Sequence, residues 1–353
     1  MRYSLFFKAF ILGSLVFIFS CKKEPGTLDS PYRRDVPVLL ATRISSYDLR
    51  EVHFSFDIAV FKANNEINEI QEFLGLPDSS FKFVDYETTN LTAVTWVRFH
   101  VEKSEYVDTI PQHTFSTVFL IDQSASPENF DSTDYWNSRF QAFNAFYRNL
   151  NGLGNVAFSS YKRTSTSHDV VTFLNPEFSS AWDPVTAKSL LDLTHQQSGT
   201  SGLYDALEQA IDHISSFNSP NKSVTLFVRN KDDGNSKLTL SEVIALANEK
   251  GIKINVVWLI HETENVDLKA LRQLSARTGG FSVYMSSIYQ SSTVFQGLAK
   301  ILRMEMSFYR VHANMTIEEP NYFATAYSSG MYLYYYVSEF YNWSYIPFYL
   351  EKP

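Results

Sequence analysis

The feature that most constrains the fold is an alternation of apolar, strand-like runs with amphipathic segments across residues 116–311. Residues 117–121 and 252–260 are near-continuous apolar runs, whereas residues 203–217 repeat apolar side chains every three or four positions. A parallel strand buried on both faces has the first pattern, and a helix that packs on a sheet has the second. The alternation therefore predicts an α/β domain with a mostly parallel central sheet flanked by helices.

The same patterns locate the elements of this domain. We expect strands at residues 117–121, 156–161, 223–228, 252–260 and 281–284. We expect helices at residues 135–150, 203–217, 241–250, 267–277 and 293–308. Gly251 and Gly279 follow two of these helices, where a left-handed residue commonly ends a helix.

The segments on either side of the α/β domain have the character of β structure. Before it, strand formers dominate four runs, at residues 36–42, 52–61, 81–86 and 94–101, and only residues 66–74 fit a short helix. After it, aromatic strand-like sequence fills residues 322–327, 331–340 and 343–350. A tail of about 42 residues is short for an independent domain. We therefore expect the tail to pair with the N-terminal strands, so that the α/β domain is inserted in, or appended to, a small β-sandwich.

The N-terminus has the anatomy of a secretory signal segment. Arg2 and Lys8 precede the apolar run of residues 9–19, which is too short for a comfortable membrane span. The run leads into the sequence IFSC, whose last residue, Cys21, is the single cysteine of the chain. This ending resembles the lipobox of bacterial lipoproteins. The resemblance implies cleavage before Cys21, a lipid on that residue and attachment to the bacterial outer membrane, on a side left open; a plain N-terminal anchor is the alternative.

These features divide the chain into five expected segments. Residues 1–20 are a signal peptide, and the polar, turn-rich residues 21–34 are a flexible tether. Residues 35–113 contribute the first part of the sandwich, residues 114–311 form the α/β domain, and residues 312–353 complete the sandwich.

The composition excludes several classes of protein. With 44% hydrophobic and 19% charged residues, the chain is neither disordered nor a coiled coil. Its 30 Lys and Arg residues against 38 Asp and Glu residues, with no basic stretch, argue against nucleic acid as a partner. A single cysteine excludes intramolecular disulfides, and the scattered histidines exclude a structural zinc site of the usual spacing.

The strand at residues 117–121 leads directly into a candidate ligand-binding loop. The loop begins DQSAS, so that Asp122, Ser124 and Ser126 place one carboxylate and two hydroxyls at alternate positions. Ligands of an open parallel sheet bind beyond the carboxyl ends of its strands. A cluster of hard oxygen atoms suits Mg²⁺ or Mn²⁺ better than zinc. The sequence therefore indicates these three residues as candidate metal ligands.

Residues 116–311 resemble a von Willebrand factor A domain. Four segments carry the resemblance in the expected order: TVFLIDQSAS, SGTSGLYDAL, VTLFVRNKDDGNSKLTLSEVIALANEKGIKI and LRQLSARTGGFSVY. The resemblance implies a Rossmann-like α/β fold. It also implies a metal-ion-dependent adhesion site, in which an Asp-x-Ser-x-Ser loop, a threonine from a second loop and an aspartate from a third hold a divalent cation. That cation binds an acidic side chain of a protein partner.

The first two loops of such a site can be matched in this chain. Asp122, Ser124 and Ser126 match the first loop outright. The family's second-loop threonine stands two residues before a Leu-Tyr-Asp triplet, which places Ser201 at that position. Thr200 is the match if the loop has one extra residue, and either side chain supplies a hydroxyl.

The third loop departs from the family pattern. One alignment places Asn230 where the aspartate is expected, and another places Arg229 there. Asparagine brings no charge, and arginine would repel a cation. Asp232 or Asp233 could substitute by swinging in. Asp205 resembles an aspartate of the family's Leu-Tyr-Asp-Ala motif, and its place on a helix predicts support of the loops rather than metal ligation.

The sequence favours a non-enzymatic binding module. No serine stands in a nucleophile-elbow sequence, no His-Glu-x-x-His helix is present, and His195 lies near the second loop without such partners. The leading hypothesis is a lipid-anchored protein-binding or adhesion-type module that presents the loops at the carboxyl ends of the parallel strands to a protein partner, with Mg²⁺ or Mn²⁺ in an incomplete site. The alternative is a structural envelope-assembly protein with a degenerate metal site that binds through the β-sandwich.

Overall fold

The structure is a computed structural model that describes most of the chain after residue 35. The described residues are 36–48, 50–64, 69–72, 76–83, 87–88, 95–108, 114–124, 142–150, 152–179, 199–228, 230–259, 267–285, 291–303, 306–317, 326–337 and 340–352. The chain divides into two units, Met1–Arg33 and Arg34–Pro353, and all described residues belong to the second. The predicted signal peptide, the tether and Cys21 therefore lie outside the described residues.

The described elements are mostly strands. In chain order, the strands are β1 (Val36–Tyr47), β2 (Glu51–Asn64), β3 (Glu69–Glu72), β4 (Phe81–Phe83), β5 (Glu87–Thr88), β6 (Thr95–Val107), β7 (Phe115–Asp122), β8 (Gly154–Tyr161), β9 (Val171–Ser179), β10 (Lys222–Val228), β11 (Ile252–Leu259), β12 (Ser282–Met285), β13 (Phe308–Ile317), β14 (Ala326–Val337) and β15 (Phe340–Glu351). The helices are α4 (Leu203–Ser215), α5 (Leu240–Glu249), α6 (Leu268–Thr278) and α7 (Ser291–Leu302), besides the short 3-10 helix η2 (Asp78–Ser80) and the helical residues 142–148.

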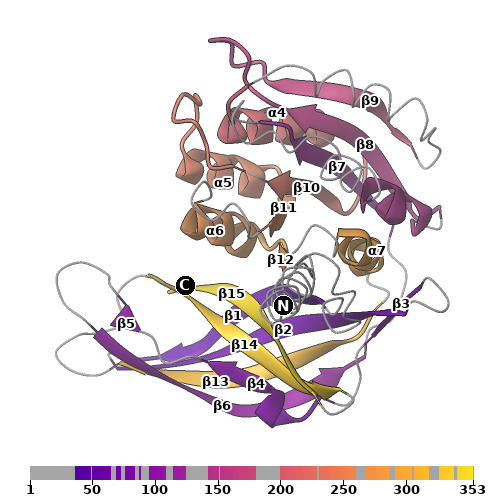
Figure 1. Cartoon of the computed structure of the whole chain (residues 1–353). Coiled ribbons are helices and arrows are strands. Elements are labelled where there is room, and N and C mark those ends of the chain that lie inside the picture. Colours follow the sequence, from indigo (N-terminus) through magenta and orange to yellow (C-terminus); the bar gives the residue numbers. More distant parts are fainter. Residues whose placement is uncertain are drawn as a thin grey trace, which may run out of the picture. The chain divides into compact units, whose positions relative to one another are not determined.

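The strands form two sheets (Figure 1). A 12-stranded sheet has the order β5-β6-β13-β2-β1-β12-β11-β10-β7-β8-β9, with β3 paired to β2. A 3-stranded sheet has the order β15-β14-β4. Within the large sheet, β12, β11, β10, β7 and β8 are parallel neighbours, and β9 is antiparallel to β8.

Helices cover both faces of the parallel strands. The buried side chains of α4, α5 and α6 pack on one face, and those of α7 and of residues 142–148 pack on the other (Figure 1). Every residue of β7 is buried, as expected of a central parallel strand. Thr239 and Glu242 form a reciprocal capping box at the start of α5, and Gly279 ends α6 with a left-handed φ of 71°. The predicted α/β class is confirmed.

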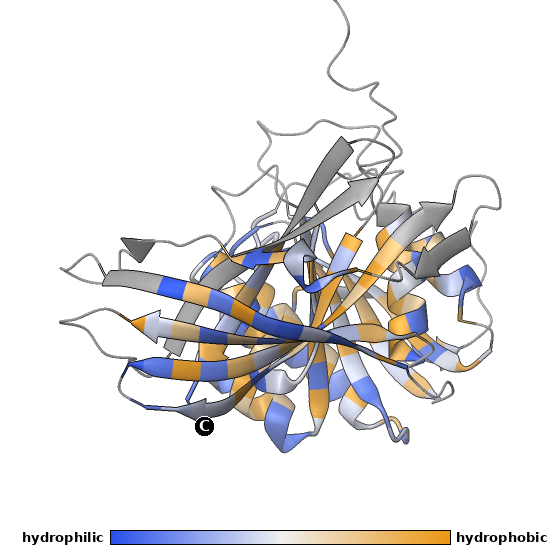
Figure 2. Cartoon of the chain, turned by 90° about the horizontal axis from the view of Figure 1, so that it is seen from below, coloured by the Kyte–Doolittle hydropathy of each residue, from blue (hydrophilic) through white to orange (hydrophobic). Residues whose placement is uncertain are grey.

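The strands before β7 and those after α7 form the predicted sandwich. The core of the sandwich lies between two layers: strands β2 and β13 of the large sheet form one, and the small sheet forms the other. It includes Phe54, Phe56, Val311 and Phe348. β13 lies between β2 and β6 and is antiparallel to both, so a strand that follows the α/β domain pairs with strands that precede it. Alternate residues of β13 are buried, and Figure 2 shows hydrophilic and hydrophobic residues alternating along strands of this part. The expectation that N- and C-terminal strands build one sandwich is confirmed.

The sandwich and the α/β part share a sheet and a core. β1 pairs with β2 and also, at Val38 and Leu39, with β12. Phe61 of β2 is fully buried in the same cluster as α7, and a Cβ atom added at Gly297 of α7 would lie 2.6 Å from the Phe61 ring. Gly297 is therefore required for this close approach. Gln273 of α6 also donates a hydrogen bond to the Tyr349 hydroxyl of β15, at 3.0 Å.

Two expectations about local structure are wrong. Residues 66–74 were expected to form a helix, but β3 lies within them, because residues 61–64 of β2 extend beyond the part that pairs with β13 and accept β3 as a paired strand. The last helix was expected to reach Phe308, but α7 ends at Leu302 and β13 begins at Phe308, where the apolar spacing changes to a period of two. The expected domain boundary between residues 311 and 312 falls inside β13, and β9 was not predicted. Among the described residues, no helix is long and apolar enough to cross a membrane.

Candidate functional site

The candidate site lies where β7 and β10 end and α4 begins. Asp122 is the last residue of β7 and is the cross-strand partner of Tyr161 in β8. Residues 230–237 follow β10, and residues 199–202 precede α4. Because β7, β8 and β10 are parallel, their carboxyl ends meet at one edge of the sheet. We call residues 122–124, 199–202 and 230–237 the loop face.

The carboxylate of Asp122 is buried and accepts three hydrogen bonds from protein groups. The residue has no exposed surface. Its Oδ1 accepts hydrogen bonds from the backbone N–H of Ser124, at 2.8 Å, and from the Ser124 hydroxyl. Its Oδ2 accepts from the backbone N–H of Asn230, at 2.9 Å. The carboxylate therefore ties the loop after β7 to the loop after β10 with protein donors.

The side chain of Asn230 completes this connection. Its Nδ2 donates to the Ser124 backbone oxygen at 3.1 Å and to the Ser124 Oγ at 2.9 Å. A backbone carbonyl only accepts, so the nitrogen rather than the oxygen of the amide must face it. The Ser124 hydroxyl thus donates to Asp122 and accepts from Asn230. The structure brings together these three of the predicted site residues, whereas Ser126 and Arg229 lie outside the described residues.

The second loop is held by the third. The Thr200 hydroxyl donates to Oδ2 of Asp233 at 2.7 Å, and the backbone N–H of Asp233 donates to the Ser201 oxygen at 2.7 Å. Ser201 is buried, whereas Thr200 is exposed. Asp233 therefore does not turn toward Asp122. Asp232 is also engaged elsewhere, because its carboxylate accepts from the backbone N–H of Tyr204 and from the Ser236 hydroxyl.

Tyr161 adds a buried neutral hydroxyl beside Asp122 and Ser201. Burial, and then the negative charge of Asp122, raise the pKa of Tyr161 well above its usual value, against a smaller opposing effect of Ser201. The phenol therefore stays protonated. Within the described part of the chain, the hydroxyls of Tyr161 and Ser201 and the side-chain amide of Gln123 form no hydrogen bond of ordinary geometry. These three buried groups retain hydrogen-bonding capacity at the loop face.

Arg163 joins the loops beside the candidate site, and the sequence did not predict this role. It follows β8, its side chain is 6% exposed, and its guanidinium donates to Asp233 Oδ2 at 2.7 Å and to Asp205 Oδ2 at 2.8 Å. A single arginine in a loop matches no motif. The pair of glycines in SGTSG was the one sequence signal for this close contact. A Cβ atom added at Gly199 would lie 2.7 Å from the Arg163 backbone oxygen, and one added at Gly202 would lie 2.8 Å from the Arg163 Nη2.

Asp205 supports the loops, as its position on a helix predicted. Its carboxylate has no exposed surface and accepts from Arg163, from Nδ1 of His168 at 2.8 Å and from the backbone N–H of Lys237 at 2.7 Å. Burial opposes its ionisation. The hydrogen bonds from Arg163, Lys237 and His168 outweigh burial and leave the pKa of Asp205 below its usual value.

The described residues do not fit a divalent cation as they are arranged. Asp122 is the one carboxylate that the Asp122–Ser124–Asn230 network contains, and its two oxygens already accept three hydrogen bonds. The Asn230 amide places a donor, not a lone pair, against Ser124. The described residues contain no group of three or more His, Cys, Asp or Glu side chains that could hold a metal. A hard cation needs several free oxygen lone pairs, and most lone pairs of Asp122 and Ser124 already accept hydrogen bonds.

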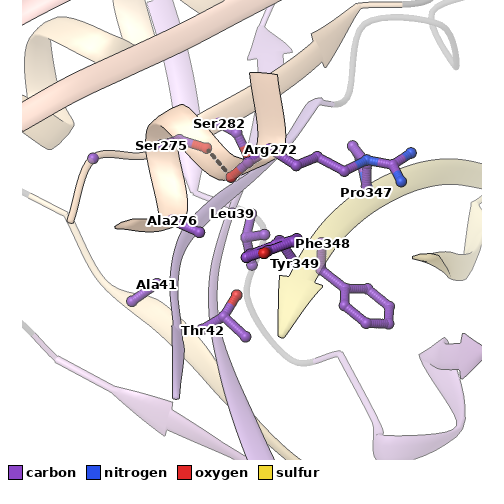
Figure 3. Close-up of a pocket in the computed structure, with 11 residues that line it drawn as sticks. Leu39, Ala41, Thr42, Arg272, Ser275, Ala276, Ser282, Pro347, Phe348 and Tyr349 are labelled. Carbon is purple, nitrogen blue, oxygen red and sulfur yellow. Dashed lines mark hydrogen bonds between the residues drawn. The ribbon is translucent and has the colours of Figure 1, made fainter. Parts of the chain in front are cut away.

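A small hollow lies at the opposite edge of the parallel strands. It is lined by residues of α6, β1 and β15, including Leu39, Arg272 and Tyr349 (Figure 3). It also touches Ser282, the first residue of β12, which places it at the amino end of that strand. Its room for about one water molecule is too small for an organic ligand.

Comparisons with known proteins find only distant similarity. No family model and no curated protein matches the chain. Among solved structures, it is similar to a von Willebrand factor type A protein from Catenulispora acidiphila, at 10% identity over 91% of this chain and 74% of that one, with a TM-score of 0.46. It is also similar to proximal thread matrix protein 1 from the mussel byssus, at 14% identity over 61% and 49%, with a TM-score of 0.42.

A second structure of the mussel protein is described as having a zinc-occupied metal-ion-dependent adhesion site motif. It is 14% identical over 60% of this chain and 50% of that one, with a TM-score of 0.41. This chain thus spans about half the length of the mussel protein. None of these similarities assigns a family or a ligand to the chain.

Proposed function

We propose that this protein is a non-enzymatic protein-binding module of the von Willebrand factor A type, lipid-anchored in the bacterial envelope, which binds a protein partner through its loop face. The observation that carries the proposal is the convergence of Asp122, Ser124 and Asn230 at the carboxyl ends of β7 and β10. Ligands of open α/β sheets bind at this edge. The resemblance of residues 116–311 to the family's sequence pattern supports the same interpretation.

The exposed surface of the loop face suits a polar protein partner. Thr200, Lys231, Asn235 and Lys237 are exposed there, above a buried layer that includes Ser201. Exposed loops that are fixed from below by buried hydrogen bonds present a preorganised surface, which lowers the entropy cost of binding. A cation could join only after Asn230 releases Ser124, so we propose no cation-dependent step.

The anchoring part of the proposal rests on Cys21. Replacing Cys21 with serine removes the only thiol that a lipid could modify. The Cys21→Ser protein should leave the membrane fraction or accumulate as an unprocessed precursor, which fractionation and mass spectrometry would show. Recovery of a fully processed variant in the membrane fraction would contradict lipid anchoring.

The binding surface can be located by site-specific photo-crosslinking in cells of the native host. A photoreactive residue at Lys231 places the probe on the loop face, and one at Tyr106, which is 49% exposed on β6, places the matched control on the sandwich. We expect a discrete cross-linked adduct from position 231 and none from position 106. An adduct from position 106 alone would support the structural alternative, in which the sandwich binds the partner, and would reject the loop face.

A further inference from the structure

The guanidinium of Arg163 lies among oxygen atoms from three different segments. Its Nη1 donates to the Ser167 backbone oxygen at 2.7 Å, and its Nε donates to Asp233 at 2.7 Å. Its Nη2 donates to Asp205 at 2.8 Å and approaches the Ser236 hydroxyl at 3.4 Å. Carboxylate, carbonyl and hydroxyl oxygens are the ligands that a hard divalent cation takes in proteins. Arg163 thus occupies an environment of the kind that such a cation prefers.

This environment connects two of the three segments of the loop face, residues 199–202 and 230–237, to α4 and to the connection between β8 and β9. Ser167 belongs to the connection between β8 and β9, Asp205 to the first turn of α4, and Asp233 to the loop after β10. Asp233 in turn accepts from the Thr200 hydroxyl, which brings in the second loop. The backbones of Arg163 and Thr200 also pair in both directions, at 2.8 and 2.9 Å. A single side chain therefore fixes the relative positions of these segments.

Two buried carboxylates, those of Asp205 and Asp233, share the guanidinium of Arg163. The side chains of Asp205 and Asp233 are 0% and 8% exposed, and buried carboxylates are costly unless they are paired. Arg163 contacts both of them, and His168 contacts Asp205. Gly202 leaves the room that the guanidinium needs, because a Cβ atom added there would lie 2.8 Å from Nη2, whereas Gly199 leaves room for the Arg163 backbone. The surroundings are therefore shaped for a guanidinium.

We propose that Arg163 is an internal cation that assembles the loop face, so that the face forms without a bound metal. The same residues, Asp205 and Asp233, are thereby withheld from any metal site near Asp122. This last step rests on the proposed function: if the loop face is the binding surface, partner binding is independent of divalent cations.

The proposal predicts that a divalent cation stabilises the fold only when the guanidinium of Arg163 is removed. Arg163→Gln deprives the buried carboxylates of Asp205 and Asp233 of the guanidinium that they share, and its melting temperature should fall by about 5 °C or more. Mg²⁺ should recover several degrees of this loss by binding the vacated oxygens. Arg163→Lys keeps the charge but cannot reach all the acceptors, so it should show a smaller loss and little response to Mg²⁺.

The measurement is thermal unfolding of the full chain in detergent, after chelator treatment and then across a Mg²⁺ titration. The wild type should melt at the same temperature throughout. A saturable rise of its melting temperature with Mg²⁺ would overturn the proposal, as would an Arg163→Gln protein that folds and gains nothing from Mg²⁺. If Arg163→Gln does not fold, the wild-type and Arg163→Lys titrations decide. Because the probe is Mg²⁺ alone, failure here is distinct from failure of the cross-linking test.

Discussion

Replacing Phe348 with alanine should lower the free energy of unfolding by about 3–5 kcal/mol, the usual cost of emptying a large aromatic site in a core. Phe348 of β15 is 1% exposed. Its ring lies 4.8 Å from that of Phe56 and 6.2 Å from that of Phe54, both on β2. It also lies 5.9 Å from each of the rings of Phe83 and Phe99. These contacts join the small sheet to the large one.

Denaturant unfolding of the full chain measures this loss. Tyr47→Ala is the matched control, because Tyr47 also lies in the sandwich but is 46% exposed, and its loss should be about 0.5 kcal/mol or less. Since the sandwich and the α/β part share Phe61 and a continuous sheet, both should unfold together in the Phe348→Ala protein. A loss near that of Tyr47→Ala would show that the C-terminal hairpin does not complete the core.

Replacing Asp122 with alanine should lower the free energy of unfolding by about 3 kcal/mol or more, because three buried donors lose their acceptor and each one left unpaired costs about 1–3 kcal/mol. The substitution strands the backbone N–H groups of Ser124 and Asn230 and the Ser124 hydroxyl. Thr200→Ala removes one exposed donor to Asp233 and serves as the control, with a much smaller expected effect. Equal losses in the two variants, measured by denaturant unfolding, would mean that Asp122 does not organise the loops.

Hydrophobic periodicity correctly predicted the strands and helices that are buried against the sheet. The run at residues 252–260 became β11, and the apolar face of residues 203–217 became α4, since packing on a sheet selects these patterns. β3 and β9 lie at sheet edges, where the neighbouring strand rather than the sequence decides pairing. The strand at residues 308–317 shows a clear period of two. No glycine or proline separates it from the preceding helix, so the sequence predicts a helix that runs on to residue 308.

The site was predictable where a motif defines it and unpredictable where tertiary contacts do. Asp122, Ser124 and Asn230 meet, as the order of loops in a parallel sheet implies. The role of Arg163 could not be predicted, because its partners Asp205 and Asp233 are 42 and 70 residues away along the chain. The missing third-loop aspartate was visible in the sequence. The sequence did not show that the side-chain amide of Asn230 would donate hydrogen bonds to Ser124 at that place.

Hydrogen–deuterium exchange at individual amides of the loop face tests the central claim, that protein groups alone hold the face together. The backbone N–H groups of Ser124 and Asn230 donate to the Asp122 carboxylate, and the backbone N–H of Asp233 donates to the Ser201 backbone oxygen. All three should be protected equally in chelator and in Mg²⁺, and Asp122→Ala should expose the first two while leaving Asp233 protected. Protection of Ser124 and Asn230 that appears only when Mg²⁺ is added would contradict the account.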